Sequence, residues 1–382
     1  MSVQHYLKMI RHASVAQRCH ATAALAHIYL HSDLESDERS ATEEVLTLLL
    51  DDPSPKVRLA LAEAFSTSAR APLHIVACLA RDQGEIAAYM LGRSVLLSDG
   101  DLVDCAVTGG GEAQRVIAAR ARVSISVSAA IIEIGETVAV LELLANAQAR
   151  ISPVSFRRLV ERLGHVAEIR AVLADDSRLP ADCRHALAVR TAEALCRMDI
   201  VHMLLGAGRA QRVVREACIR ASISLVATTP AADYPALIEH LLLRGDITTA
   251  FVIRVVAAGE IDFFCAVLVA LSGYRHKRVR AILVDGRPAG LGALFSAAGL
   301  PETTHKPLSF AVRQWHDSAG GGLKLQLQDV IQSMIEHIAD DAGRLQAMPT
   351  AANDDMLSLL KGIHRDAIRD AARHRAAAIA VA

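Results

Sequence analysis

The segment Asp51–Phe65 carries the pattern that most constrains the fold: one helix ends, a turn with two prolines follows, and a largely apolar helix begins. Pro55 suits the first helical position because its missing N–H would have no intrahelical partner there. Comparable junctions follow at Asp82, Asn146 and Asp175, at successive intervals of 31, 64 and 29 residues, and the interval of 64 fits two units of 32. Repeats of about 20–50 residues are typical of solenoids, whose helical hairpins bury their apolar faces against their neighbours. The sequence therefore predicts an α-solenoid.

The amino-acid composition favours helices over strands. Hydrophobic residues make up 52% of the 382-residue chain and aromatic residues only 3%, with Ala, Leu, Val and Ile dominant. Ala and Leu are strong helix formers, whereas a β-protein would need more aromatic residues and threonine. We therefore expect an all-α fold.

Three regions are expected along the chain. Residues 1–228 contain the repeats, with Gly109–Gly111 as an internal turn and a later unit through Leu204-Leu205-Gly206. Residues 229–317 form a helical subdomain that continues the stack, and residues 318–382 contain a flexible joint at Ser318–Gly322 and the C-terminal helices. Trp315 is expected to anchor a helix end.

Individual helices are predicted from apolar periodicity and from glycine and proline breaks. Ser36 is expected to supply a capping oxygen for a helix that runs to Leu50, with acidic residues in its first turn. The other main helices are predicted over Val3–Arg11, Ser14–Leu30, Tyr234–Leu243, Thr248–Ala258, Ile261–Leu271, Val279–Leu283, Leu291–Ala298, Leu323–Ile338 and from Asp354 towards the C-terminus. Breaks between them are predicted at Gly245, Gly259, Gly273, Gly286 and Gly299.

The pattern that ends in Val57-Arg58 resembles a HEAT-type repeat, and Asp52 and Arg58 occupy the positions that are thought to bridge adjacent units in that class. Over roughly residues 10–315 the chain resembles a bacterial family of unknown function built on such repeats. The stretches that carry this resemblance are Asp51–Phe65, Leu79–Asp82, Leu91–Ser98, Gln114–Arg120, Leu144–Asn146, Gly259–Phe264 and Ala297–Pro301. The resemblance implies a HEAT-like α-solenoid with an appended helical subdomain, and it supplies no catalytic residues.

Two sets of basic residues are candidate interaction surfaces. Arginine suits bidentate contacts with carboxylate or phosphate. Salt bridging between repeats is the favoured alternative for the first set, because acidic turns recur beside it. The first set is Arg115, Arg120, Arg122, Arg157, Arg158 and Arg162, and the second, in the densest basic run, is Arg275, Lys277, Arg278 and Arg280.

His20, His27 and His31 are weak candidate metal ligands. On one helix their spacing places them on a single face, and His27 and His31 could share an ion. The motif His-Glu-x-x-His is absent, however, because Ile28, Tyr29 and Leu30 fill the interval. With 16 histidines in the chain, coincidence is the favoured interpretation, and we expect neither a metal nor another cofactor.

The C-terminal helix carries an apolar stripe at Leu360, Ile363, Ala367 and Ala371. Because the stripe is small, packing onto the body of the protein or a homodimer through these helices is favoured over contact with a membrane. The longest clean apolar run, Phe263–Leu271, is far shorter than the ~20 residues that span a bilayer.

Seven cysteines without zinc or thioredoxin spacing suit a reducing compartment. The first residues lack the charged-then-apolar order of a signal peptide. We therefore expect a cytoplasmic protein without a membrane span.

The predicted function is a non-catalytic scaffold or regulatory adaptor that presents a curved helical-repeat surface to another protein. One alternative is nucleic-acid binding through the arginine-rich faces. The net charge of −1 and the scarcity of aromatic residues count against it. A second alternative is a metal-dependent enzyme that uses the face of His20, His27 and His31.

Overall fold

The computed structural model describes residues 13–321, 326–344 and 351–381. Over these ranges the chain is built from α-helices and two short 3-10 helices, and an isolated β-bridge joins Val123 and Ala149. The expected all-α class is therefore confirmed. The chain divides into two compact units, Met1–Leu179 and Pro180–Ala382, which we call unit 1 and unit 2. The expected domain boundaries after residues 228 and 317 stay predictions.

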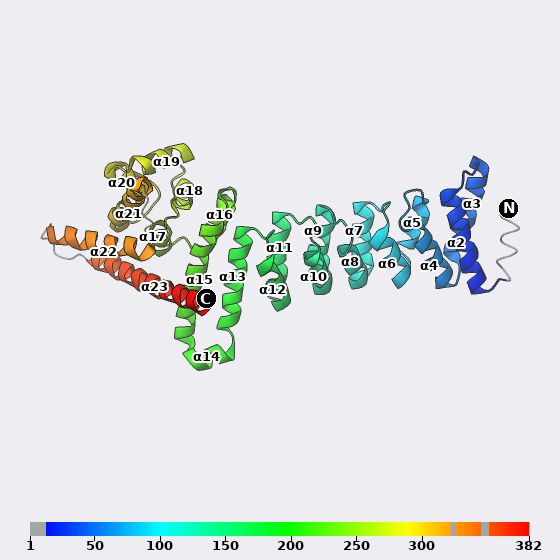
Figure 1. Cartoon of the computed structure of the whole chain (residues 1–382), viewed down its shortest axis with the longest axis horizontal. Helices are drawn as coiled ribbons and strands as arrows, with labels where there is room; N and C mark the ends of the chain where they lie inside the picture. Colours follow the sequence, from blue (N-terminus) through cyan, green and yellow to red (C-terminus); the bar gives the residue numbers. More distant parts are fainter. Residues whose placement is uncertain (1–12, 322–325, 345–350, 382) are drawn as a thin grey trace. The chain divides into compact units, whose positions relative to one another are not determined.

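Unit 1 contains short helices that follow one another along a row in Figure 1. They are α2 (Val15–His31), α3 (Ser36–Leu48), η1 (Leu49–Asp51), α4 (Pro55–Phe65), α5 (Leu73–Leu79), α6 (Gly84–Arg93), α7 (Asp99–Thr108), α8 (Gly110–Ala118), α9 (Ile125–Ile134), α10 (Thr137–Ala145), α11 (Pro153–Leu163) and α12 (Ala167–Asp175).

The helices of unit 1 pack in two series. The even-numbered helices from α2 to α12 each contact the next even-numbered one, and α7, α9 and α11 form a second series. In α4 the buried residues Val57, Leu61 and Phe65 recur at intervals of four, which places them on one helix face. Each short helix thus buries its apolar face against neighbours close in sequence.

Ion pairs in unit 1 join a helix of one hairpin to the turn at the start of the next hairpin. Arg18 of α2 donates to both carboxylate oxygens of Asp52, at 2.9 and 3.1 Å. Arg58 of α4 in turn donates to both carboxylate oxygens of Asp82, at 2.6 and 3.0 Å, and to the backbone oxygen of Asp52 at 2.7 Å. Asp52 and Arg58 thus each contact a charged residue of another hairpin, while their side chains are not paired with each other.

Unit 2 contains longer helices as well as short ones. They are α13 (Ala181–Cys196), α14 (Asp199–Leu205), α15 (Ala207–Thr228), η2 (Ala231–Asp233), α16 (Tyr234–Arg244), α17 (Thr249–Ala257), α18 (Ile261–Ser272), α19 (His276–Asp285), α20 (Pro288–Ala297), α21 (Glu302–Gly321), α22 (Leu327–Arg344) and α23 (Ala351–Val381).

The core of unit 2 runs from α13 to α23. Phe263 and Phe264 of α18 are fully buried in it, and so is Phe295 of α20. The stripe on α23 joins this core: Leu360, Ile363 and Ala367 are buried, and α23 packs beside α22 (Figure 1). Arg254 of α17 also donates to Asp366 of α23 at 3.0 Å. The C-terminal stripe is thus covered within unit 2, and a homodimer through these helices stays a prediction.

Most predicted helices are found with boundaries shifted by a few residues. Two details differ. Ser36 is the first residue of α3 and Glu35 stands at the cap position, with no side-chain capping bond. The expected joint at Ser318–Gly322 begins inside α21, which runs to Gly321. The predicted helix Val3–Arg11 lies outside the described residues. The predicted glycine breaks between α16 and α21 all adopt positive φ.

Candidate functional site

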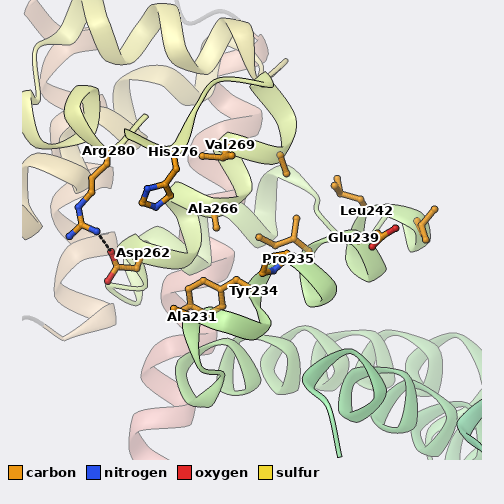
Figure 2. Close-up of a pocket in the computed structure, with 13 residues that line it drawn as sticks. Ala231, Tyr234, Pro235, Glu239, Leu242, Asp262, Ala266, Val269, His276 and Arg280 are labelled. Carbon is orange, nitrogen blue, oxygen red and sulfur yellow. Dashed lines mark ion pairs between the residues drawn. The ribbon is translucent and has the colours of Figure 1, made fainter. Parts of the chain in front are cut away.

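An open groove lies in unit 2 between α16 and α18, and the start of α19 closes one end of it (Figure 2). Its volume is about 760 Å³. We call it the α16–α18 groove. Its lining residues are Ala231 of η2; Tyr234, Pro235, Ile238, Glu239, Leu242 and Leu243 of α16; Asp262, Ala266, Val269 and Ala270 of α18; and His276 and Arg280 of α19.

The helical period explains why these residues share one surface. Pro235, Ile238, Glu239 and Leu242 of α16 recur at intervals of three or four, and the lining residues of α18 follow the same spacing, so each helix turns one face towards the groove. The opposite faces of both helices are buried in the core of unit 2. Each of the two helices therefore has two apolar faces. One is buried in the core of unit 2, and the other lines the groove.

The lining of the groove is largely apolar and partly exposed to solvent. Leu243 is 83% exposed and Leu242 is 38% exposed. Tyr234 packs edge-on against the buried Phe263, with ring centroids 5.1 Å apart, and this contact holds its ring in place at the groove wall. Large exposed apolar side chains gathered in one concave place are typical of surfaces that bind another molecule.

Charged side chains stand at the two ends of the groove. Glu239 lies beside Leu242 at one end, while His276, Arg280 and Asp262 lie at the other (Figure 2). Arg280 and Asp262 form a loose ion pair at 3.7 Å, and their side chains are 63% and 76% exposed. This pair can open to bind a partner's charge, because exposed ion pairs contribute little stability.

Two acidic residues, Glu260 and Asp262, stand at the start of α18, and Asp262 lines the groove. Burial, followed by the negative charge of Asp262, raises the pKa of Glu260 above its usual range. Burial and the charges of Glu260 and Asp262 also raise the pKa of the Tyr234 hydroxyl. The phenol is therefore neutral at physiological pH and can serve as a hydrogen-bond donor to a bound segment.

The first set of predicted arginines is used largely inside unit 1. Arg120 donates to the backbone oxygens of Leu91 and Ser94 at the end of α6. Arg162 likewise donates to the backbone oxygens of Ile132 and Gly135 at the end of α9. Carbonyls at the end of a helix have no intrahelical partner, so these two arginines cap helices of a preceding hairpin.

The other members of the first set differ in their contacts. Arg158 donates to both carboxylate oxygens of Glu133 at 2.7 Å, and Arg115 pairs with Glu112 of its own helix at 2.8 Å. Arg122 is exposed, and Arg157 takes part in a contact within the described structure. An interaction surface formed by the whole set stays a prediction.

The second predicted basic set lies at the start of α19. Arg280 lines the groove, and Arg275 stands at the cap position of α19. The guanidinium of Arg278 lies over the ring of Tyr274, 4.1 Å from its centre. Lys277 is exposed. The structure thus brings one member of this set into the candidate site.

The histidine candidates lie on α2. The rings of His27 and His31 approach to 4.5 Å between centroids, and His20 is exposed on the same helix. Across the described residues, no group of three His, Cys, Asp or Glu side chains has the geometry to hold a metal ion. Within the same ranges, no helix is both long and apolar enough to cross a membrane.

Sequence reasoning did not find Tyr234, Pro235, Ala266 and Val269 as site residues. For Ala266 and Val269 a signal existed in the run Phe263–Leu271, which is apolar on every side, whereas Tyr234 and Pro235 of α16 lie outside that run. A helix of this kind buries one face in its own unit and has apolar side chains left over on another. The apolar side chains of α18 that are not buried in the core form the floor of the groove.

The described residues define an all-α protein of two compact units, with an open apolar groove in the second. The model of the family described as an uncharacterised protein conserved in bacteria (DUF2336) matches residues 86–346, which is more than half of the chain. The chain belongs to this family, and the expected membership of a bacterial family of unknown function is confirmed. No curated protein matched the chain. No solved structure matched it either.

Proposed function

We propose that this protein is a non-catalytic scaffold or regulatory adaptor of the bacterial cytoplasm that holds a helical segment of a partner protein in the α16–α18 groove. In this proposal unit 1 is a HEAT-like α-solenoid that presents a further curved surface. The observation that carries the proposal is the groove itself: apolar side chains line an open volume of about 760 Å³.

The dimensions of the groove favour a short amphipathic helix as the bound segment. Its lining residues on α16 extend from Tyr234 to Leu243, a length of about 14 Å at 1.5 Å per residue. A partner helix of two to three turns matches that length and would place apolar residues at intervals of three and four on the floor. A basic residue of the partner would face Glu239, and an acidic residue would face His276 and Arg280.

The series of helix contacts in unit 1 supports the solenoid part of the proposal. Each even-numbered helix contacts the next, and the ion pairs of Asp52 and Asp82 join different hairpins. A stack of this kind depends on contacts between near neighbours. It leaves a long side surface for other proteins.

Photo-crosslinking tests the proposal. A photoreactive amino acid at Leu243, at the open lip of the groove, should capture one recurrent protein in the bacterium that makes this chain. The same residue at Leu73 of unit 1, which is also exposed (57%), should not capture it. The captured protein, once purified, should bind the chain in titration calorimetry.

Two groove variants make the test specific. Ala266→Trp fills the floor of the groove, and Glu239→Arg reverses the charge at one end without touching the core. Each should weaken binding of the purified partner by about tenfold or more, since one lost anchor or one like-charge contact costs on the order of 1–2 kcal/mol. Equal affinity for wild type and both variants would remove the groove from the proposal.

The alternative functions give different results. A nucleic-acid binder should shift DNA or RNA in a gel at low salt and lose this binding as salt rises. A metal-dependent enzyme should carry a stoichiometric metal after gentle purification. Either result without a protein partner would replace the scaffold proposal.

A further inference from the structure

Unit 2 has a second exposed apolar surface, formed by the short helix α14 and the end of α13. Ile200, Met203 and Leu204 of α14 are 55%, 79% and 77% exposed. Their spacing of three and four residues places them on one face of the helix. Leu195 and Met198 at the end of α13 are also half-exposed. We call residues 195–204 the α14 tip, which lies where α13 and α15 are joined (Figure 1).

Basic residues flank the α14 tip along the chain, at the end of α13 and in the first turns of α15. Arg197, Arg209, Arg212 and Arg215 are all exposed, and the described part of the chain shows no ion pair for any of them. Arg58 of unit 1, by contrast, is held by the carboxylate of Asp82. In the stretch 197–216 four arginines stand against two acidic residues. The tip therefore combines an outward apolar face with positive charge that is not neutralised by pairing.

We propose that the α14 tip docks on the surface of an anionic lipid bilayer. Ile200, Met203 and Leu204 would enter the boundary between headgroups and acyl chains, while the arginines contact lipid phosphates. Outward apolar side chains with a basic rim are the composition of segments that lie in the membrane interface, and anionic lipids attract nearby arginines. The contact is peripheral, because none of the described helices can cross a bilayer.

Charge favours a bilayer over a second copy of the chain as the partner of this surface. Two α14 tips packed face to face would gather the arginines of both copies around one apolar centre, and like charges at an interface oppose association. A bilayer also requires no shape match from a small convex tip. The tip residues are separate from those of the α16–α18 groove, so this inference does not depend on partner binding there.

Vesicle flotation tests the proposal with the full-length protein. Vesicles of phosphatidylcholine with 30% phosphatidylglycerol should carry the protein at low salt, and pure phosphatidylcholine vesicles should carry much less. Leu204→Asp should lower binding to the anionic vesicles at least about tenfold, since it removes an apolar side chain from the interface. The matched variant Leu73→Asp, at an exposed leucine of unit 1, should bind as wild type does.

A second variant distinguishes a loss of membrane binding from a folding defect at the tip. Arg209→Gln combined with Arg212→Gln changes only exposed side chains, and it should lower binding about tenfold at low salt and flatten the salt dependence. Circular dichroism should show unchanged helix content in all variants. The proposal is overturned if anionic vesicles fail to bind the wild type, if neutral vesicles bind equally well, or if both tip variants bind normally. It is also overturned if the tip variants dissolve a dimer in solution while leaving vesicle binding intact, because the tip would then contact a second copy.

Discussion

The carboxylate of Asp52 stabilises its own turn and also binds an arginine of a neighbouring helix. Its side chain accepts from Arg18 at two positions and from the backbone N–H of Ser54 at 2.8 Å. The carboxylate is 6% exposed. Asp52→Asn keeps the turn bond but removes the charge that Arg18 requires. We expect the free energy of unfolding of unit 1 to fall by about 1.5–3 kcal/mol, measured by urea denaturation followed with circular dichroism.

An exposed ion pair of the same unit supplies the control. Arg158 and Glu133 are about half-exposed, at 49% and 51%. Arg158→Gln should leave the urea midpoint almost unchanged, because exposed pairs contribute little. If the two substitutions had equal effects, the ion pairs between hairpins would not stabilise unit 1.

His185 makes the stability of unit 2 depend on pH. It contacts Ser222 at 2.9 Å and His240 at 3.2 Å, and burial, followed by the charge of His240, lowers its pKa to about 4. Its ordinary pKa is near 6.5. Below that pH the histidine of the unfolded chain binds a proton, whereas His185 in the folded chain stays neutral until the pH approaches 4. Stability is therefore complete above pH 6.5 and falls as the pH drops towards 4.

The expected loss can be measured with Trp315, because the chain has 1 tryptophan and it lies in α21. Between pH 7 and pH 5 the free energy of unfolding of unit 2 should fall by about 1–2 kcal/mol, at ~1.4 kcal/mol per pH unit and proton. His185→Gln should show a smaller fall over the same range. The nearby groups His240, Arg244 and Asp246 remain in that variant, so a pH dependence equal to that of wild type would assign the effect to them.

At the scale of single residues, the sequence identified residues that join neighbouring hairpins, but it did not identify their partners. The pattern around Val57 singled out Asp52 and Arg58, and both make contacts between hairpins. Their partners Arg18 and Asp82 lie 34 and 24 residues away. A pattern inside one repeat does not specify the register with the next, because that register is set by side-chain packing between helices.

At the scale of helices, the turn between α17 and α18 depends on Gly259. This residue has φ +87°, and a Cβ atom there would lie 3.0 Å from the ring of Trp315. The same ring donates its N–H to the backbone oxygen of Val256 at 2.8 Å, which confirms the expectation that Trp315 anchors a helix end. Gly259→Ala should destabilise unit 2 by about 1–3 kcal/mol, because it adds strain at positive φ to a steric clash.

Gly292 is the matched control within the same unit. It lies inside α20, and a Cβ atom there would meet no other atom within 4 Å. Gly292→Ala should be neutral or stabilise the helix by up to about 1 kcal/mol. Thermal unfolding followed by Trp315 fluorescence compares the two variants, and a stabilising effect of Gly259→Ala would contradict the strain argument.

The intervals between repeated sequence patterns predict the number of helices correctly in one part of unit 1 and incorrectly in another. The interval from Asp51 to Asp82 contains α4 and α5, as one hairpin should. The interval from Asp82 to Asn146 was expected to hold two hairpins, but it contains five helices, α6 to α10. These helices have only 9 or 10 residues each. A length count cannot distinguish four longer helices from five short ones when the turns between them are tight.

At the scale of the whole molecule, the groove could not be predicted from the sequence because it needs the register of α16 against α18. The apolar run Phe263–Leu271 was visible, but a run of this kind also fits a fully buried helix. Only packing shows that Phe263 and Phe264 turn inward while Ala266, Val269 and Ala270 line an open surface. The arginines illustrate the same limit, since Arg120 and Arg162 cap helix ends that lie about thirty residues earlier.

A comparison of two fragments can decide where the domain boundary lies. The sequence suggested a boundary after residue 228, where the spacing of helices changes, whereas the compact units divide at Leu179 and Pro180. The helices α13 and α15 contact α16 and α17, and Val226 belongs to the core of unit 2. A fragment of residues 180–382 should therefore unfold cooperatively, with the Trp315 emission of the full chain.

A fragment of residues 229–382 lacks α13 and α15 and should expose part of the core around Leu237 and Ile238 of α16, which are buried in the full chain. We expect it to bind a hydrophobic dye and to lose several kcal/mol of stability, since each large apolar side chain that becomes exposed costs about 1.5–3 kcal/mol. If this shorter fragment were as stable as residues 180–382, the boundary after residue 228 would be correct. The hairpin of α13 and α15 would then be an appendage that carries the α14 tip, because the folding of the rest would not require it.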